Sequence, residues 1–380
     1  MSFKIKIPAV SRRTALAATA ASLLPHMPVW SQKIDLLIGQ SAPLSGSFAT
    51  LMSGVLEGQQ MAFDEVNQRG GINGRHIKLV MLDDGFDPKR TLENVQSLVE
   101  KQEVIALFGI VGTAQTAAVL PYIVEKRVPL ISIYTGSPAL RTQANPYLFT
   151  TQASYADELV KIVRNLKAVQ STRLAVVYQN NEFGKLLLPL AEKIIVAEGA
   201  EVVAARPLDA GGADAVAVAQ GLAALRPHAV IMLVTGPAVV SYIKANRAYL
   251  GAPIYTLSLA IGSAILKALG EDVRGVAIAR TTPYPWRATT PLTRDFNQGM
   301  KRLDKPVDYD HFTGYINARI LIEGLRGAGK DPSAQSLAQA MEKLTQLDIG
   351  GYRLAFSPEN HHGSNFVEIT VMGPNGTFMR

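Results

Sequence analysis

Short β-rich runs alternate with helical periods through most of this chain, and this alternation constrains its fold more than any other feature. The first four runs span residues 34–39, 77–82, 104–108 and 128–133. Between them, apolar residues recur at helical spacing. Such an alternation is typical of a parallel sheet with helices on both faces. The sequence therefore predicts an α/β lobe in the first part of the chain.

A second series of the same kind begins after Ser154, and it predicts a second α/β lobe. Its β-rich runs span residues 174–178, 201–205, 229–234 and 275–279. Beyond Thr282 the pattern becomes helix-rich, and two further strands are expected near the end of the chain, at 351–356 and 365–372. About 350 residues exceed what a single core usually supports, so two lobes agree with the length.

The N-terminal segment has the order of a removable signal peptide, predicted here as residues 1–32. It carries four basic residues and no acidic one, then an apolar stretch from Ala15 to Leu24 and small residues before the expected cleavage site. Ser11-Arg12-Arg13 fits the twin-arginine export route, and ordinary secretion fits equally well. The sequence therefore predicts export to the periplasm of a two-membrane cell.

Charge and composition exclude several classes of protein once that segment is removed. The remaining chain has 34 basic and 31 acidic residues, a net charge of about +3, without a basic run suited to nucleic acid. No later stretch is long and apolar enough for insertion into a membrane. The chain contains no cysteine, which excludes disulfides, thiolate metal sites, cysteine catalysis and a lipid-bearing anchor.

Catalytic and metal-binding motifs are absent. The sequence has no G-x-S-x-G elbow, no phosphate-binding loop, no H-E-x-x-H pair and no dinucleotide fingerprint after the first strand. His361 and His362 lie in a turn-forming segment, where adjacent residues seldom both bind a metal. Asp83 and Asp84 precede a helix start, where turn and capping roles are expected. We therefore predict no enzyme activity, no cofactor and no metal.

Small and hydroxyl-bearing residues follow the strands of the first lobe and open its helices. They occupy residues 45–48, 109–113 and 134–137. In open α/β sheets ligands bind outside the carboxyl ends of the strands, and helix N-termini with short hydroxyls suit a carboxylate. The same residue types also serve as ordinary helix caps. Composition alone leaves both roles open.

Four segments, taken in order and spacing, resemble the periplasmic receptors of branched-chain amino-acid-type (leucine/isoleucine/valine-binding) ABC importers. They are Pro43-Leu44-Ser45-Gly46, Gly70-Gly71-Ile72-Asn73-Gly74, Asp83-Asp84-Gly85-Phe86-Asp87-Pro88 and Tyr134-Thr135-Gly136-Ser137-Pro138. The resemblance covers nearly all of the chain after the first thirty residues.

This resemblance implies an α/β, two-lobed type I periplasmic binding protein, in which each lobe is a parallel sheet flanked by helices. The chain is expected to cross between lobes three times, near Ala153, Thr282 and Leu344. The first lobe would then comprise residues 33–153 plus 283–344, and the second lobe residues 154–282 plus 345–380.

The resemblance also implies a carboxylate site in the first lobe. In the resembled family, two loops hold the α-carboxylate of the ligand through hydroxyls and backbone N–H groups. They match Gly112-Thr113-Ala114 and Tyr134-Thr135-Gly136 here. Tyr134 fills a position that is small in the leucine receptors, so we expect it to form a wall of the pocket.

The partners of a ligand ammonium group are missing from the matching positions. The resembled receptors place an acid, a tyrosine and a glutamate where this chain has Ser154, Phe183 and Ser258. A small carboxylate without an α-amine, with aromatic walls around it, is therefore the expected ligand, unless Asp157, Glu158 or Glu182 replaces the missing acids. The predicted ligand-binding residues are Phe48, Leu51, Gly112, Thr113, Ala114, Tyr134, Thr135, Gly136, Ser154, Tyr155, Phe183 and Ser258.

The resulting prediction is a monomeric substrate-binding protein that closes on its ligand and delivers it to an inner-membrane ABC permease. Two alternatives remain open at this point. A receptor of the same fold could signal to a kinase or chemoreceptor, and an exported hydrolase or lyase is the other alternative. For Arg141 we favour a structural role over contact with the ligand.

Overall fold

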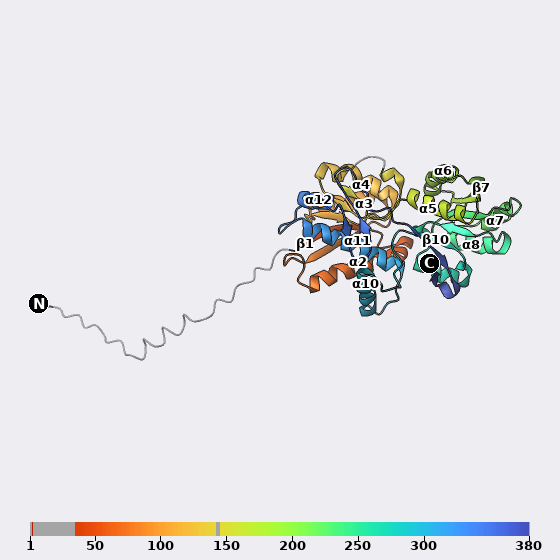
Figure 1. Ribbon diagram of the computed structural model, residues 1–380. Coiled ribbons are helices and arrows are strands. Elements are labelled where there is room, and N and C mark those ends of the chain that lie inside the picture. Colours follow the sequence, from red (N-terminus) through yellow and green to blue (C-terminus); the bar gives the residue numbers. More distant parts are fainter. Residues whose placement is uncertain (1, 3–34, 142–144, 380) are drawn as a thin grey trace. The chain divides into compact units, whose positions relative to one another are not determined.

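The computed structural model describes residue 2, residues 35–141 and residues 145–379. The predicted signal peptide therefore lies outside the described residues apart from Ser2. The described chain forms two large sheets flanked by helices (Figure 1) and one two-stranded hairpin, which confirms the predicted α/β class. None of the helices in these ranges is both long enough and apolar enough to cross a membrane.

The first sheet has five parallel strands in the order β2-β1-β3-β4-β5. They are β1 (Leu36–Ala42), β2 (Ile77–Asp83), β3 (Ala106–Phe108), β4 (Leu130–Ile131) and β5 (Leu148–Phe149). Alternate residues of β1 face opposite cores, with Ile38 on one side and Leu37 on the other, as the period of a strand requires. Both faces of this sheet are therefore buried.

Helices of the first sheet divide between its two cores. On one face pack α2 (Ser47–Gln68), α10 (Pro291–Arg302), α11 (Tyr309–Gly327) and α12 (Ala334–Glu342). On the other pack α3 (Pro88–Glu100) and α4 (Thr113–Lys126). Asp87 caps α3 through the backbone N–H groups of Lys89 and Arg90, with Pro88 in the first turn, as the sequence predicts.

The second sheet has seven strands in the order β14-β13-β10-β9-β8-β6-β7. The parallel strands are β6 (Arg173–Gln179), β7 (Glu201–Leu208), β8 (Ala229–Leu233), β9 (Ile254–Thr256) and β10 (Ala277–Arg280). Two antiparallel strands complete the sheet, β13 (Glu368–Met372) beside β10 and β14 (Phe378–Met379) beside β13. The second sheet is therefore mixed, not purely parallel.

Two cores again enclose this sheet. One core contains α5 (Tyr155–Ala168) and α6 (Glu182–Ala197), and the other contains α7 (Ala215–Ala223), α8 (Pro237–Tyr249) and α9 (Ser263–Leu269). In β6, Leu174 and Val176 face the first of these cores while Ala175 and Val177 face the second. The buried strand therefore reads as a continuous apolar run.

The last segment divides differently from the prediction, which assigns all of 345–380 to the second lobe. Ile349, Tyr352 and Phe356 are buried in a core of the first sheet, together with the hairpin of β11 (Leu347–Asp348) and β12 (Arg353–Leu354). We therefore propose that the third crossing lies within residues 357–367, before β13. The crossings near Ala153 and Thr282 remain predictions.

Candidate functional site

The start of α4 provides backbone donors beside the carboxyl end of β3. Gly112 is the N-cap residue and offers no side chain to accept from the first turn. The first N–H groups of a helix have no intrahelical partner, and the positive end of the helix dipole lies there. Thr113 and the exposed Ala114 are the first two residues of α4. This end of the helix suits an anion.

The two predicted threonines meet at that point. The hydroxyl oxygens of Thr113 and Thr135 are 2.8 Å apart, although the residues follow different strands. The Thr135 hydroxyl also lies 3.4 Å from the phenolic oxygen of Tyr155, and it accepts from the Ser137 N–H at 3.2 Å. Adjacent parallel strands β3 and β4 bring the two loops together because their carboxyl ends meet at one edge.

Two glycines permit this close arrangement. Gly112 has φ +99°, a conformation that strongly favours glycine, and a Cβ there would overlap the Gln115 side chain. A Cβ on Gly136 would lie 2.5 Å from the Tyr155 ring. Gly136 also accepts from the Tyr155 N–H at 2.8 Å, so the ring packs directly over the second loop.

Phe48 and Tyr134 contribute aromatic surface from the first sheet. Phe48, in the first turn of α2, stacks on Phe86 with ring centroids 3.8 Å apart and planes 12° apart. Leu51 lies one helical turn further and is half-buried. Tyr134 packs beside Val111, and burial raises the pKa of its phenol. Its hydroxyl is 3.5 Å from Gln59 Oε1, so it points into a buried amide network.

The predicted residues at the start of α5 have defined partners. Ser154 caps α5, accepting from the Asp157 N–H at 3.2 Å and donating to the Asp157 carboxylate at 2.6 Å. The rings of Tyr155 and Phe183 meet edge to face with centroids 6.0 Å apart. The Asp157 carboxylate therefore caps its own helix, while Glu182 is exposed at the start of α6.

Ser258 is held by a buried acid of α5. The Glu158 carboxylate, 1 % exposed, accepts from the Ser258 N–H at 2.6 Å and from its hydroxyl at 3.0 Å. Desolvation by burial raises the Glu158 pKa to about 7, against the lowering by the Ser258 donors and by Arg280. Arg280 in turn donates to the carbonyl oxygens of Ser258 and Ile261. Glu158 and Arg280 thus both hold the Ser258 loop, the acid through its donors and the arginine through its carbonyl oxygens.

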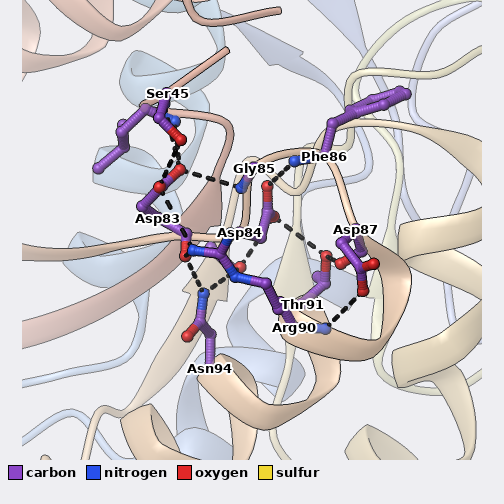
Figure 2. Close-up of polar contacts among 11 residues, drawn as sticks. Ser45, Asp83, Asp84, Gly85, Phe86, Asp87, Arg90, Thr91 and Asn94 are labelled. Atoms are coloured by element: carbon purple, nitrogen blue, oxygen red, sulfur yellow. Dashed lines mark hydrogen bonds and ion pairs between the residues drawn. The ribbon is translucent and has the colours of Figure 1, made fainter.

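The acids of the β2–α3 loop hold the first-lobe loops in place, as Figure 2 shows. Asp83 accepts from the N–H groups of Leu44, Ser45 and Gly85 at 2.9 to 3.2 Å and from the Ser45 hydroxyl at 2.7 Å. The Ser45 hydroxyl is the main cause of the lowered Asp83 pKa, and the Gly85 N–H follows. Asp83 therefore has the turn-stabilising role predicted from the sequence.

No metal centre is evident in the part of the chain that the structure describes, which contains no group of three or more His, Asp or Glu side chains able to hold an ion. His361 Nδ1 lies 3.1 Å from the Asn145 carbonyl oxygen, and His362 Nδ1 lies 3.0 Å from the Thr150 hydroxyl. These contacts give both histidines structural partners.

A cavity of about 430 Å³ is lined by Arg141, Asp157, His362 and, among the predicted ligand-binding residues, Ser154. Arg141 donates to the Gln152 carbonyl oxygen at 3.0 Å, which supports the structural role favoured for it. Neither Thr113 nor Thr135 lines this cavity. We propose the threonine pair as the ligand site because it combines paired hydroxyls with an uncapped helix start, whereas the cavity places an acid beside its cation.

Comparison with known protein families identifies the family to which this chain belongs. The model of the periplasmic binding protein family matches residues 36–376, which include the first sheet, the second sheet except β14, and the threonine pair. The chain belongs to the periplasmic binding protein family. This confirms the family predicted from the sequence.

Individual relatives of this periplasmic binding protein agree with that assignment. It is 22% identical to Leu/Ile/Val-binding protein homolog 7 of Brucella suis over 360 residues, with 86% of each chain covered. A substrate-binding periplasmic protein from Ralstonia solanacearum matches with 29% identity and a TM-score of 0.81, over 91% of this chain and 99% of that one. A solute-binding protein from R. palustris in complex with benzoate shares the fold, with 19% identity and a TM-score of 0.76 over 91% and 95% of the chains.

Two residues beside the proposed site of this periplasmic binding protein are not among those predicted from the sequence. Phe86 stacks on Phe48, and Gln115 donates to the Phe86 carbonyl oxygen at 2.7 Å. The segment Asp83 to Pro88 was singled out as a motif, but nothing in its letters indicates where the Phe86 ring points. The pairing of Glu158 with Ser258, 100 residues apart, carries no local signal either.

Glu158 gives this periplasmic binding protein a testable pH dependence. An acid whose pKa is raised in the folded state stabilises the fold below its unfolded value, 4.5, and loses that contribution as the pH rises through about 7. The shift corresponds to roughly 3 kcal/mol. We therefore expect the stability of the wild type relative to Glu158→Gln to fall between pH 5 and pH 8, measured by urea unfolding.

Glu93→Gln is the control for this measurement, since Glu93 is exposed on α3 and lies apart from the Ser258 loop. The difference in the free energy of unfolding between Glu93→Gln and the wild type should stay nearly constant across the same pH range. A constant difference for Glu158→Gln as well would show that Glu158 retains no proton in the folded protein at neutral pH.

Proposed function

We propose that this protein is the substrate-binding component of an ABC importer and that it binds a small carboxylate lacking an α-amine in the periplasm. The observation that carries the proposal is that Glu158, the buried acid at the start of α5, already has donors of its own. Both of its oxygens accept from Ser258. The Glu158 side chain is also buried, 1 % exposed, so an incoming ammonium group could reach it only if the Ser258 loop moved aside.

The carboxylate half of the proposal rests on the start of α4. The hydroxyls of Thr113 and Thr135, together with the first N–H groups of the helix, would donate to the carboxylate oxygens. Hydrogen bonds to a charged group contribute about 1.5–3 kcal/mol each. Phe48, Leu51, Tyr134, Tyr155 and Phe183 would surround the rest of the ligand, with Ser154 and Ser258 at the second lobe.

Selectivity against amino acids follows from the missing amine partner. A buried charge that loses its partner costs roughly 3–5 kcal/mol, which corresponds to two to four orders of magnitude in affinity. Asp157, another acid that could have met an amine, supports the same conclusion because its carboxylate accepts hydrogen bonds from Ser154. The ligand is therefore expected to be an organic acid, aliphatic or aromatic, without a positive charge.

Transport requires no covalent chemistry in this account. Ligand held by the first lobe gains further contacts when the second lobe closes over it, and the difference in affinity between the two states favours closure. An inner-membrane permease would recognise the closed form. We propose a monomer with no enzyme activity and no cofactor, in line with relatives that are binding proteins.

A thermal-shift panel of matched pairs tests the proposal. The pairs are 3-phenylpropionate with L-phenylalanine and 4-methylpentanoate with L-leucine, and each pair differs only in the α-amine. Benzoate, the ligand of the R. palustris neighbour, completes the panel. A ligand at a hundred times its Kd should add about 2.7 kcal/mol of stability. We expect the acids without the amine to stabilise the protein, and stabilisation by the amino acids alone would contradict the proposal.

A further inference from the structure

Phe86 has a backbone conformation that is unfavourable for a residue with a large side chain. Its φ is +66°, in the left-handed region, and the preceding Gly85 has φ +55°. Glycine tolerates this region, but a residue with a Cβ does so at a cost, and such residues concentrate at functional sites. The position therefore calls for a reason why a phenylalanine occupies it.

Neighbouring side chains hold this conformation from both sides of the residue. The Phe86 N–H donates to Asp84 Oδ1 at 2.9 Å, and its carbonyl oxygen accepts from Gln115 Nε2 at 2.7 Å. Asp84 is itself buried and accepts from the hydroxyls of Ser41 and Thr91, of which Figure 2 labels Thr91. The backbone of Phe86 is thus held by hydrogen bonds on both its N–H and its carbonyl oxygen.

The ring of Phe86 is only partly buried, at the edge of the small core cluster of Ala42, Met52, Val55 and Val111. Figure 2 shows it projecting away from the carboxylates of Asp83 and Asp84. It stacks on Phe48, and both rings remain half-exposed. A Cβ built on Gly112 would lie 3.0 Å from Phe86 Cε2, so the ring edge reaches the residue immediately before Thr113. The strained residue therefore directs a partly open aromatic surface to the start of α4.

We propose that Phe86 determines specificity, forming with Phe48 a flat aromatic wall that contacts the planar ring of an aromatic carboxylate bound at Thr113. This inference rests on the proposed function, since it needs the carboxylate site at α4. An aromatic pair in a favourable arrangement gains about a few-fold to tenfold in affinity beyond simple burial. An aliphatic chain at the same wall gains burial but not this additional attraction.

The test compares Phe86→Leu with the wild type by isothermal titration calorimetry of 3-phenylpropionate and 4-methylpentanoate. We expect Phe86→Leu to weaken binding of the aromatic acid by about 3- to 10-fold and to change the affinity for the aliphatic acid by less than about 2-fold. Phe86→Tyr keeps the ring and should retain wild-type selectivity. Phe366→Leu removes another half-buried ring, one that meets Tyr352, and should change neither affinity.

Each outcome separates this inference from the proposed function. If the wild type binds neither acid, the proposed function fails and the inference falls with it. If the wild type binds both acids but Phe86→Leu leaves their affinity ratio unchanged, the inference alone is overturned. Unfolding midpoints of all variants are measured first. If Phe86→Leu does not fold, Phe48→Leu is titrated with both acids instead. A changed ratio of the two affinities in Phe48→Leu would then support the inference, and an unchanged ratio would overturn it.

Discussion

Replacing Gly314 with alanine is expected to destabilise the protein by about 3 kcal/mol or more. Gly314 lies in α11 where that helix crosses α2, and a Cβ there would overlap the carbonyl oxygen of Val55. The contact is reciprocal, because a Cβ on Gly58 of α2 would overlap the carbonyl oxygen of His311. Overpacking a well-packed core usually costs about 1–3 kcal/mol. Here the new methyl group would meet backbone atoms of α2, which cannot move aside as a flexible side chain could.

Chemical unfolding followed by circular dichroism measures this effect, with Gly221→Ala as the control. Gly221 is also helical, in α7, but it is exposed and a Cβ there would meet nothing within 4 Å. Alanine should stabilise that helix by about 0.5–1 kcal/mol. If Gly314→Ala were as stable as the wild type, α2 and α11 would not cross as closely as described.

The double substitution Thr113→Val and Thr135→Val is expected to weaken binding of the carboxylate ligand by about 100-fold or more. Valine keeps the shape of threonine but removes the hydroxyl. Each hydrogen bond to a charged group contributes about 1.5–3 kcal/mol, and each 1.4 kcal/mol is a factor of ten in affinity. The affinity is measured by isothermal titration calorimetry with the best acid from the thermal-shift panel.

Thr116→Val is the matched control for this pair. Thr116 is a buried threonine of the same helix, but its hydroxyl donates to the Gly112 carbonyl oxygen at 2.8 Å. We expect its affinity to stay within about 2-fold of the wild type. A double variant that folds and binds the acid as tightly as the wild type would remove the threonine pair from the site.

Much of the fold could be predicted because its signals are local and repeated. Long strands such as β2 and β6 stand out as apolar runs, and the capping sequence at Asp87-Pro88 marks the start of α3. The strands β5 and β9 were missed, since they have two and three residues and cannot show a period. The predicted strand at 128–133 is shorter in the structure, because Ser132 adopts φ +59° and breaks it after β4.

The site could be predicted only where topology decides it. Thr113 and Thr135 follow adjacent parallel strands, so their meeting follows from the order of the sheet. The Phe86 ring reaches Gly112, the residue before Thr113, because Asp84 and Gln115 hold the Phe86 backbone in a left-handed conformation. Asp84 is a local partner, but Gln115 lies 29 residues further along the chain, and no local pattern indicates its contact with Phe86.

The most direct test of the account is calorimetric titration of the purified protein with 3-phenylpropionate and with L-phenylalanine at pH 7. These ligands share a carboxylate and a ring and differ in the ammonium group alone. We expect the acid to bind at least about 100-fold more tightly, because the carboxylates of Glu158 and Asp157 are already hydrogen-bonded to Ser258 and Ser154. Equal or tighter binding of phenylalanine would show that one of these acids turns to meet the amine, and it would contradict the proposed ligand class.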